Sequence, residues 1–99
     1  MATFYTTGSW QPFPGQEEQF LEEWKAFAGW ATGLGGCIRP ATLARDLRDE
    51  SRFVSFLAWD SLEAIRAWKS HDEFKERMSR VQQHIDKFAP TELETVANA

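Results

Sequence analysis

Apolar and polar residues in the first third of the chain follow two successive patterns, which predict a strand and then a long helix. Residues 3–10 are rich in threonine and aromatic side chains, which favour strands. Prolines and a glycine in residues 12–15 end this strand and predict a loop. The following apolar residues recur with the helical period, at Phe20, Leu21, Trp24, Phe27, Ala28 and Ala31. Glycines within residues 33–36 then predict the end of this helix.

The middle of the chain predicts two strands joined as a hairpin. Residues 37–46 alternate loosely between apolar and polar, and the polar residues 47–51 predict a turn. Residues 52–59 predict a central strand whose two faces are both apolar, with Phe53, Leu57 and Trp59 on one face and Val54, Phe56 and Ala58 on the other. Helices of the same chain can cover one face, so we expect a second copy of the chain to cover the other.

The last third of the chain predicts two helices and a closing strand. Asp60 and Ser61 are expected to cap a helix over residues 62–69. Ser70 and Glu73 have the spacing of a capping box, which predicts that a second helix begins at Ser70. The buried stripe of this second helix is expected to contain Phe74, Met78, Val81 and Ile85. Pro90 predicts the end of the helical region, and the alternation in residues 91–96 predicts the last strand.

This order of elements is that of the split βαβ unit, so the predicted fold is α+β and ferredoxin-like, with an antiparallel four-stranded sheet. The length of 99 residues suits a single domain over residues 1–99. A sheet covered by helices on one side leaves its other face open. We therefore expect two copies to pair through this sheet face as a homodimeric α/β barrel.

Aromatic content and charge narrow the range of partners. Five Trp and eight Phe residues predict an aromatic core, with some rings left to line a ligand pocket or a subunit interface. The net charge is −4, and the arginines are interrupted by acidic residues, which argues against nucleic acid and against anionic membranes as partners. Cys37 is the only cysteine, which excludes an internal disulfide, and no segment has the pattern of a signal peptide or a membrane span. We expect a cytoplasmic protein.

Several short motifs occur in an order that resembles one protein family over almost the whole chain. They are residues 14–20, Trp24, and residues 45–46, 52–54, 59–61 and 68–74. Their order and spacing resemble the antibiotic biosynthesis monooxygenase-like family of dimeric α/β barrels. The resemblance implies activities that range from cofactor-independent oxygenation of polycyclic phenols and quinones, through haem degradation, to members of no known activity. Fold similarity alone does not decide between them.

The haem-degrading branch of that family resembles this chain at Trp68 but differs at its polar residues. In that branch an iron-binding histidine follows ten residues after the tryptophan, and an asparagine lies in the first strand. This chain has Met78 where that branch has the iron-binding histidine. Its predicted first strand contains Thr6 and Thr7 but no asparagine. Haem binding or degradation is therefore the least favoured of the activities that the resemblance implies.

The candidate site residues are one histidine, four aromatic residues and two arginines. His71 is the candidate catalytic base, because histidine titrates near neutrality; the alternative is a solvated residue at a helix start. The tryptophans Trp59 and Trp68 are expected to form the walls of a flat pocket, where the alternative is packing in the core. Trp10 and Phe74 could complete these walls, and Arg45 or Arg77 could hold a phenolate, although both arginines have nearby acidic partners.

Two functions of different classes follow from these residues. The first is a cofactor-independent monooxygenase-like protein acting on a small aromatic or quinone-like compound, with no metal and no cofactor. The second is a non-catalytic small-molecule-binding or stress-related dimeric barrel. His71 and Asp72 are adjacent and cannot share a helical face, so we predict no metal site. The two functions differ in whether a proton acceptor faces the pocket.

Overall fold

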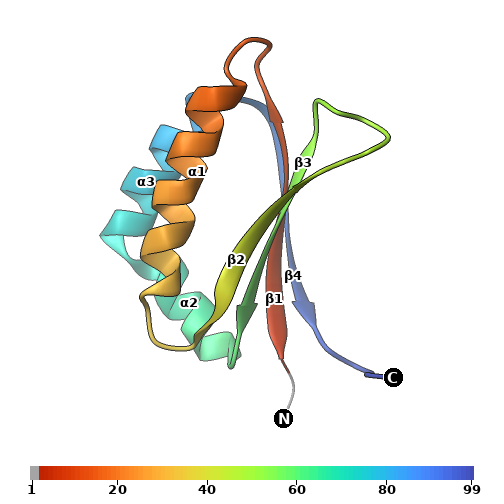
Figure 1. Ribbon diagram of the computed structural model, residues 1–99. Helices are drawn as coiled ribbons and strands as arrows, with labels where there is room; N and C mark the ends of the chain where they lie inside the picture. The colour runs from red at the N-terminus through yellow and green to blue at the C-terminus, as the bar shows by residue number, and fades with distance from the viewer. Residues whose placement is uncertain (1–2) are drawn as a thin grey trace.

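The computed structural model describes residues 3–99 as one sheet with a layer of helices on one of its faces (Figure 1). The elements along the chain are β1 (Phe4–Pro12), α1 (Glu17–Thr32), β2 (Cys37–Arg45), β3 (Phe53–Trp59), α2 (Leu62–Ser70), α3 (Asp72–Gln82) and β4 (Ile85–Glu94). The four strands are antiparallel and lie in the order β2-β3-β1-β4. This topology confirms the predicted α+β, ferredoxin-like fold with an antiparallel four-stranded sheet.

The core lies between the helices and the face of the sheet that they cover. Along β3, Phe53, Leu57 and Trp59 are buried, whereas Phe56 on the other face is 45% exposed. The predicted stripe of α1 packs against this covered face, and five of its six residues are buried: Phe20, Trp24, Phe27, Ala28 and Ala31. The inward residues at every second position of the strands and the apolar stripe of α1 therefore pack together in one core.

The start of α3 differs from the predicted capping box. Ser70 is the last residue of α2, and its hydroxyl donates a hydrogen bond to the carbonyl oxygen of Ala67 over 3.0 Å. The hydroxyl is thus already used within α2, and α3 begins at Asp72 with His71 at its N-cap position and no side-chain cap. The prediction that Ser70 starts this helix was wrong for that reason. The predicted cap of α2 is confirmed, because the Ser61 hydroxyl accepts from the Ala64 N–H.

The end of α3 and the start of β4 also differ from the prediction. The helix ends at Gln82, and Ile85 is the first residue of β4 instead of the last residue of a helical stripe. Pro90 lies inside β4 and does not end the helical region. A proline is tolerated there because β4 is an edge strand, where a missing N–H donor breaks few pairings. The opposite edge strand, β2, also contains a proline, Pro40, where its register with β3 is interrupted.

The face of the sheet opposite the helices carries no element of this chain (Figure 1). Side chains on this outer face form three rows across the four strands: Leu93, Tyr5, Ala58 and Ile38; Thr91, Thr7, Phe56 and Thr42; and Ala89, Ser9, Val54 and Ala44. These rows contain apolar, hydroxyl-bearing and small side chains and no charged one. Beside the third row, the Arg52 guanidinium donates to the Ser9 hydroxyl over 2.7 Å and pairs with Asp46, so charge lies at one end of this face. Rows of this composition are unusual on a surface that faces only water.

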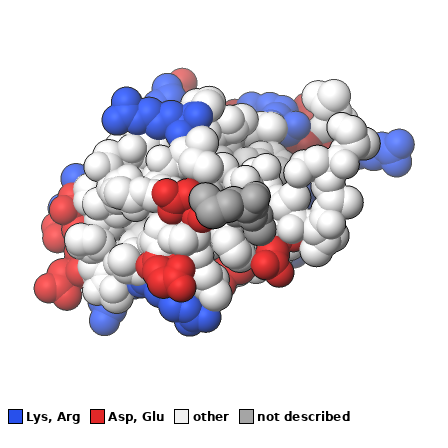
Figure 2. All heavy atoms as spheres, turned by 90° about the horizontal axis from the view of Figure 1, so that it is seen from below, with Lys and Arg blue, Asp and Glu red and all other residues white. Residues whose placement is uncertain are grey.

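Charges elsewhere on the molecule are mixed in sign. Figure 2 shows acidic and basic side chains interspersed over the end of the molecule that is lowest in Figure 1, with uncharged surface between them. Among residues 3–99, none of the helices combines the length and the apolar character that crossing a bilayer requires. Cys37 is half-buried at the start of β2, and this burial raises the pKa of its thiol.

Candidate functional site

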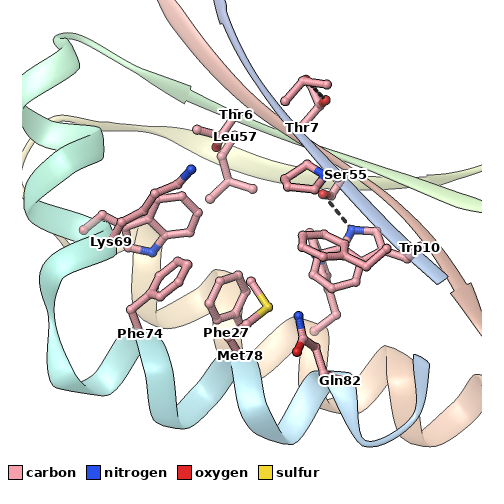
Figure 3. A pocket seen from close by; sticks show the side chains of 16 residues that line it. Thr6, Thr7, Trp10, Phe27, Ser55, Leu57, Lys69, Phe74, Met78 and Gln82 are labelled. Carbon is pink, nitrogen blue, oxygen red and sulfur yellow. Dashed lines mark hydrogen bonds between the residues drawn. The ribbon is translucent and has the colours of Figure 1, made fainter. Parts of the chain in front are cut away.

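A cavity of about 280 Å³ lies between the sheet and the helices, and it is lined mainly by aromatic side chains (Figure 3). Six aromatic residues from five elements form most of its wall: Trp10, Trp24, Phe27, Trp68, Phe74 and Phe88. The polar side chains of the lining are those of Thr6, Ser55, Lys69 and Gln82, whereas Thr7 and Thr91 border the cavity but have their side chains on the outer face of the sheet. An apolar cavity with a few convergent polar groups is the usual form of a small-molecule site.

The floor of the cavity is formed by β1 and β3. The indole N–H of Trp10 donates a hydrogen bond to the hydroxyl oxygen of Ser55 over 2.9 Å, as the dashed line in Figure 3 shows. Gly8 lies beside this pair, and a Cβ at that position would be only 2.7 Å from the Trp10 Nε1 atom and 2.9 Å from the Ser55 Oγ atom. Glycine is therefore the residue that lets the indole and the hydroxyl approach each other against the strand.

One wall of the cavity is a cluster of aromatic rings around Trp68. Its ring centroid is 4.9 Å from that of Phe74, which stands perpendicular to it, and 5.7 Å from that of Phe27. Trp59 packs behind Trp68, with ring centroids 4.9 Å apart, and is fully buried. The Trp59 indole N–H donates to the Thr6 hydroxyl over 3.0 Å, so Trp59 fixes the wall from behind and does not line the cavity.

Two buried indole groups in this cavity have no hydrogen-bond partner among the described residues. They belong to Trp24, which is 6% exposed, and to Trp68, which is 5% exposed. A buried donor without an acceptor costs about 1–3 kcal/mol, so such groups are rare in the interior of proteins. Both side chains belong to the cavity lining, but their nitrogen atoms have almost no accessible surface, so these two N–H groups do not face the cavity.

Lys69 is the single charged side chain among the cavity-lining residues of the described chain. It extends from α2 toward the strands (Figure 3), and its ammonium contacts a carboxylate oxygen of Glu92 on β4 at 2.5 Å. The hydrogen bond from Lys69 lowers the pKa of the Glu92 carboxyl group, so this carboxylate stays ionised at neutral pH. The Lys69 side chain is 36% exposed, which places it where the cavity meets solvent.

The structure brings only part of the sequence-predicted site together. Trp10, Trp68 and Phe74 line the cavity as predicted, and Trp59 supports it from behind. His71 does not line it: its exposed ring lies edge-on against Trp30, with centroids 5.6 Å apart, outside the cavity. His71 is the N-cap of α3 and contacts Trp30, whereas Phe74 in the first turn of the same helix lines the cavity.

The two arginines predicted to hold a phenolate lie outside the cavity, because each is paired with a carboxylate. Arg45 forms an ion pair with Glu17 at 2.5 Å and covers the ring of Phe53, and its hydrogen bond lowers the pKa of Glu17. Arg77 forms an ion pair with Glu73 one helical turn away at 2.7 Å. Neither arginine belongs to the cavity lining. Glu73 is the partner that the sequence indicates for Arg77, whereas Arg45 pairs with Glu17 and the neighbouring Asp46 pairs with Arg52.

Sequence reasoning missed Trp24, Lys69, Phe88 and Gly8 as cavity residues. The helical stripe assigned Trp24 to the core, and the pattern holds no sign that its N–H lacks an acceptor. For Lys69 one signal was present, because it follows Trp68 directly at the end of a helix. Among residues 3–99, no three histidine, cysteine, aspartate or glutamate side chains gather closely enough to hold one metal ion.

The fold and the cavity define a class of protein: a small ferredoxin-like domain that holds an aromatic-lined ligand site between its sheet and its helices. The sequence model of antibiotic biosynthesis monooxygenases matches residues 3–80, which is most of the chain. The chain belongs to the antibiotic biosynthesis monooxygenase family. No match was found among curated protein sequences.

Solved structures share the fold over nearly the whole chain at low sequence identity. A variant of SnoaB, a cofactor-independent oxygenase from Streptomyces nogalater, superimposes with a TM-score of 0.86 at 14% identity, covering 97% of this chain and 95% of that one. A conserved protein from Methanosarcina mazei Go1 gives 0.84 at 17% identity, with coverage of 94% and 92%. Rv0793 from Mycobacterium tuberculosis gives 0.83 at 16% identity, with 98% of both chains covered. These matches support the fold.

Proposed function

We propose that this protein is a cofactor-independent monooxygenase that acts on a small aromatic or quinone-like compound in the cavity between its sheet and its helices. The observation that carries the proposal is the aromatic wall of the cavity, which meets the Lys69 ammonium where the cavity opens to solvent. This wall suits a flat molecule whose rings stack on it and whose oxygen contacts the ammonium. Membership in the family and the fold shared with a cofactor-independent oxygenase support the same reaction class.

The reaction needs little from the protein, because the substrate supplies the electrons. A phenol bound as its anion gives one electron to O₂, and the resulting radicals combine to form a carbon-bound hydroperoxide. Loss of water from this hydroperoxide leaves a quinone carbonyl. One oxygen atom of O₂ thus enters the product and the other leaves as water, while a ring C–H and the phenol O–H are lost. The protein has to orient the ring, stabilise the anion and exclude bulk water.

The cavity matches these three requirements. Its volume of about 280 Å³ lies at the small end of ligand sites, which suits a compound of a few fused rings. Trp68, Phe27 and Phe74 are mutually packed, so the wall holds its shape without a ligand. The Lys69 ammonium supplies the polar contact for an oxygen that carries negative charge.

Oxygen uptake with a panel of hydroquinones and polycyclic phenols under metal-free conditions tests the proposal. We expect uptake with at least one compound and one O₂ consumed per quinone formed. Trp68→Phe replaces a large ring of the cavity wall by a smaller one, so the substrate is held less well and we expect kcat/KM to fall about tenfold. The matched control is Trp30→Phe, because Trp30 lies outside the cavity lining and should leave uptake unchanged.

His71→Ala tests whether His71 is the catalytic base, as the sequence predicts. Because His71 lies outside the cavity, we expect uptake to persist in this variant. Uptake lost in His71→Ala but kept in Trp30→Phe would instead support His71 as the base. No uptake with any compound, together with measurable binding of the same compounds, would favour the non-catalytic binding protein.

The outer face of the sheet supports pairing of two copies as a homodimer. The three uncharged rows across the four strands have the composition of a buried sheet face, and no helix of this chain covers them. A two-fold axis parallel to this face would stack the outer faces of two copies on each other. We infer that the dimer forms face to face, as in an α/β barrel.

Phe56→Glu tests this interface. Phe56 lies in the middle row and is 45% exposed, so in a face-to-face dimer the variant buries two carboxylates near the two-fold axis. We expect the dimer to dissociate, with a dissociation constant raised by about tenfold or more in sedimentation experiments. Ala26→Glu, on the exposed side of α1, is the control and should leave the dimer intact. A dimer that survives Phe56→Glu would contradict the assignment.

A further inference from the structure

We propose that the ion pair between Lys69 and Glu92 is a latch across the mouth of the cavity, and that it controls how fast a ligand enters and leaves. This inference rests on the proposed function only in that it concerns access to the same cavity. It assigns a role to Glu92, which is not itself a lining residue. Three observations carry it: where the cavity opens, what closes each end of the opening, and how weakly one end is held.

The exposure of the lining residues shows where the cavity opens. The lining residues that come from α1 and β3 are all buried. Every exposed residue of the lining belongs to α2, α3 or β4: Lys69, Gln82, Pro90 and Thr91. Because β4 is an edge strand, no further strand covers this side of the sheet. The mouth is therefore a slot between β4 and the two helices α2 and α3.

One end of this slot is closed by the chain itself. Gln83 and His84 connect α3 directly to β4 there. Two hydrogen bonds hold this turn against the loop before α1. The Phe13 N–H donates to the carbonyl oxygen of His84 over 2.9 Å, and Nδ1 of the His84 ring lies 2.9 Å from Oε1 of Gln16. A covalent connection with this support makes a fixed end.

The other end of the slot is held by the ion pair. Glu92 is paired with Thr6 in the sheet, so its side chain lies on the face that the helices cover. Its carboxylate meets the Lys69 ammonium at 2.5 Å. Among residues 3–99, this is the single side-chain hydrogen bond or ion pair that joins α2 or α3 to β4. The slot thus has one fixed end and one ionic end.

The ionic end can open at little cost. The side chains of Lys69 and Glu92 are 36% and 46% exposed, so water competes for both charges, and such pairs add little stability. The Lys69 hydrogen bond lowers the pKa of the Glu92 carboxyl group most, and the nearby charge of Arg66 lowers it further. Arg66 therefore remains as a cationic neighbour of Glu92 when Lys69 turns away. Entry and exit should both scale with the fraction of time for which the latch is open.

Carbodiimide coupling locks the latch in the natural protein. The reagent joins a lysine amine to a contacting carboxylate as an amide, with loss of water. Lys69–Glu92 is the only ion pair between a lysine and a carboxylate among residues 3–99, because the other four use arginine. We therefore expect one dominant internal cross-link, which peptide mass spectrometry would locate at these two residues.

Stopped-flow binding of N-phenyl-1-naphthylamine, an uncharged aromatic probe that fluoresces in apolar sites, measures the passage. We expect the cross-linked protein to bind and release the probe about tenfold or more slowly than the untreated protein. Glu92→Gln weakens the latch, so we expect both rate constants to rise about threefold with Kd nearly unchanged, because the probe carries no charge. Carbodiimide treatment of Glu92→Gln should then have no effect on its rates. The matched control is Glu94→Gln, which makes the same change in charge on the same strand outside the lining and should alter neither rate.

The outcomes separate the latch from the proposed function. Equal rates for cross-linked and untreated protein would place the entrance elsewhere and overturn the latch. A change of Kd in Glu92→Gln without parallel changes in the two rate constants would overturn it too, because Glu92 would then act on affinity. Absence of the cross-link, or of probe binding, has the same meaning. Oxygen uptake alongside equal rates refutes the latch alone, and a working latch without uptake from any phenol refutes the oxygenase alone.

Discussion

Replacing Trp59 with alanine is expected to lower the free energy of unfolding by about 3–5 kcal/mol, a large part of the stability of a domain of this size. Trp59 is fully buried at the end of β3, it packs on Trp68, and its indole N–H is bound to the Thr6 hydroxyl. The alanine variant loses the ring contacts, leaves a cavity behind the aromatic wall and frees a buried hydroxyl. Urea unfolding followed by far-UV circular dichroism measures the loss.

Two milder variants divide this loss into its parts. Trp59→Phe keeps a ring but removes the N–H, and Thr6→Val keeps the volume but removes the acceptor. Each leaves one buried polar group unpartnered, so each should cost about 1–3 kcal/mol. A loss below about 1 kcal/mol for Trp59→Ala would show that the wall does not depend on Trp59 for support.

Adding one methyl group at Gly8 is expected to disrupt the floor of the cavity. A Cβ there would lie 2.7 Å from the Trp10 indole nitrogen and 2.9 Å from the Ser55 oxygen. Both atoms are held by their mutual hydrogen bond within the two central strands, so neither can move without cost. We expect Gly8→Ala to lower the free energy of unfolding by about 1–3 kcal/mol and to displace the Trp10 ring into the cavity.

The matched control is the same substitution where space is available. Gly29 lies in α1, and a Cβ there meets no heavy atom within 4 Å. Alanine is the better helix former, so Gly29→Ala should raise the free energy of unfolding by about 0.5–1 kcal/mol. Denaturant unfolding compares the two stabilities, and binding of a polycyclic phenol reports on the cavity. Gly8→Ala with unchanged stability and unchanged binding of the phenol would contradict the geometry of the floor.

Much of the fold follows from the periodicity of apolar residues. The errors occurred at single residues that are compatible with two different local structures. The stripe of α1 and the alternation of β3 depend on burial along a whole element, so both were predicted well. Ser70 has the sequence of a helix cap, yet its hydroxyl bonds within the preceding helix. Ile85 continues a helical spacing, yet it begins a strand. Pro90 would interrupt a central strand, but it is tolerated in β4 because β4 lies at the edge of the sheet.

The sequence predicted the large aromatic residues of the cavity wall. It missed the residues whose place in the cavity depends on contacts between distant parts of the chain. Trp68 and Trp10 are large and lie on predicted inner faces, so a wall made of them follows from the pattern. The misplaced Arg45 has an acidic partner far away in the sequence, Glu17, which no spacing rule identifies. Lys69 became a site residue only because α2 ends beside β4, and that proximity is a property of the tertiary fold.

The prolines in the two outer strands also restrict how copies of this molecule can associate. Pro40 in β2 and Pro90 in β4 each remove one N–H donor from an edge to which a foreign strand would otherwise add. Growth of the sheet from molecule to molecule, the first step toward fibrils, is thereby disfavoured at both ends. In the homodimer that we propose, self-association uses the outer face of the sheet, where pairing closes after two copies. A variant with a weakened face should consequently yield monomers in solution and not long aggregates.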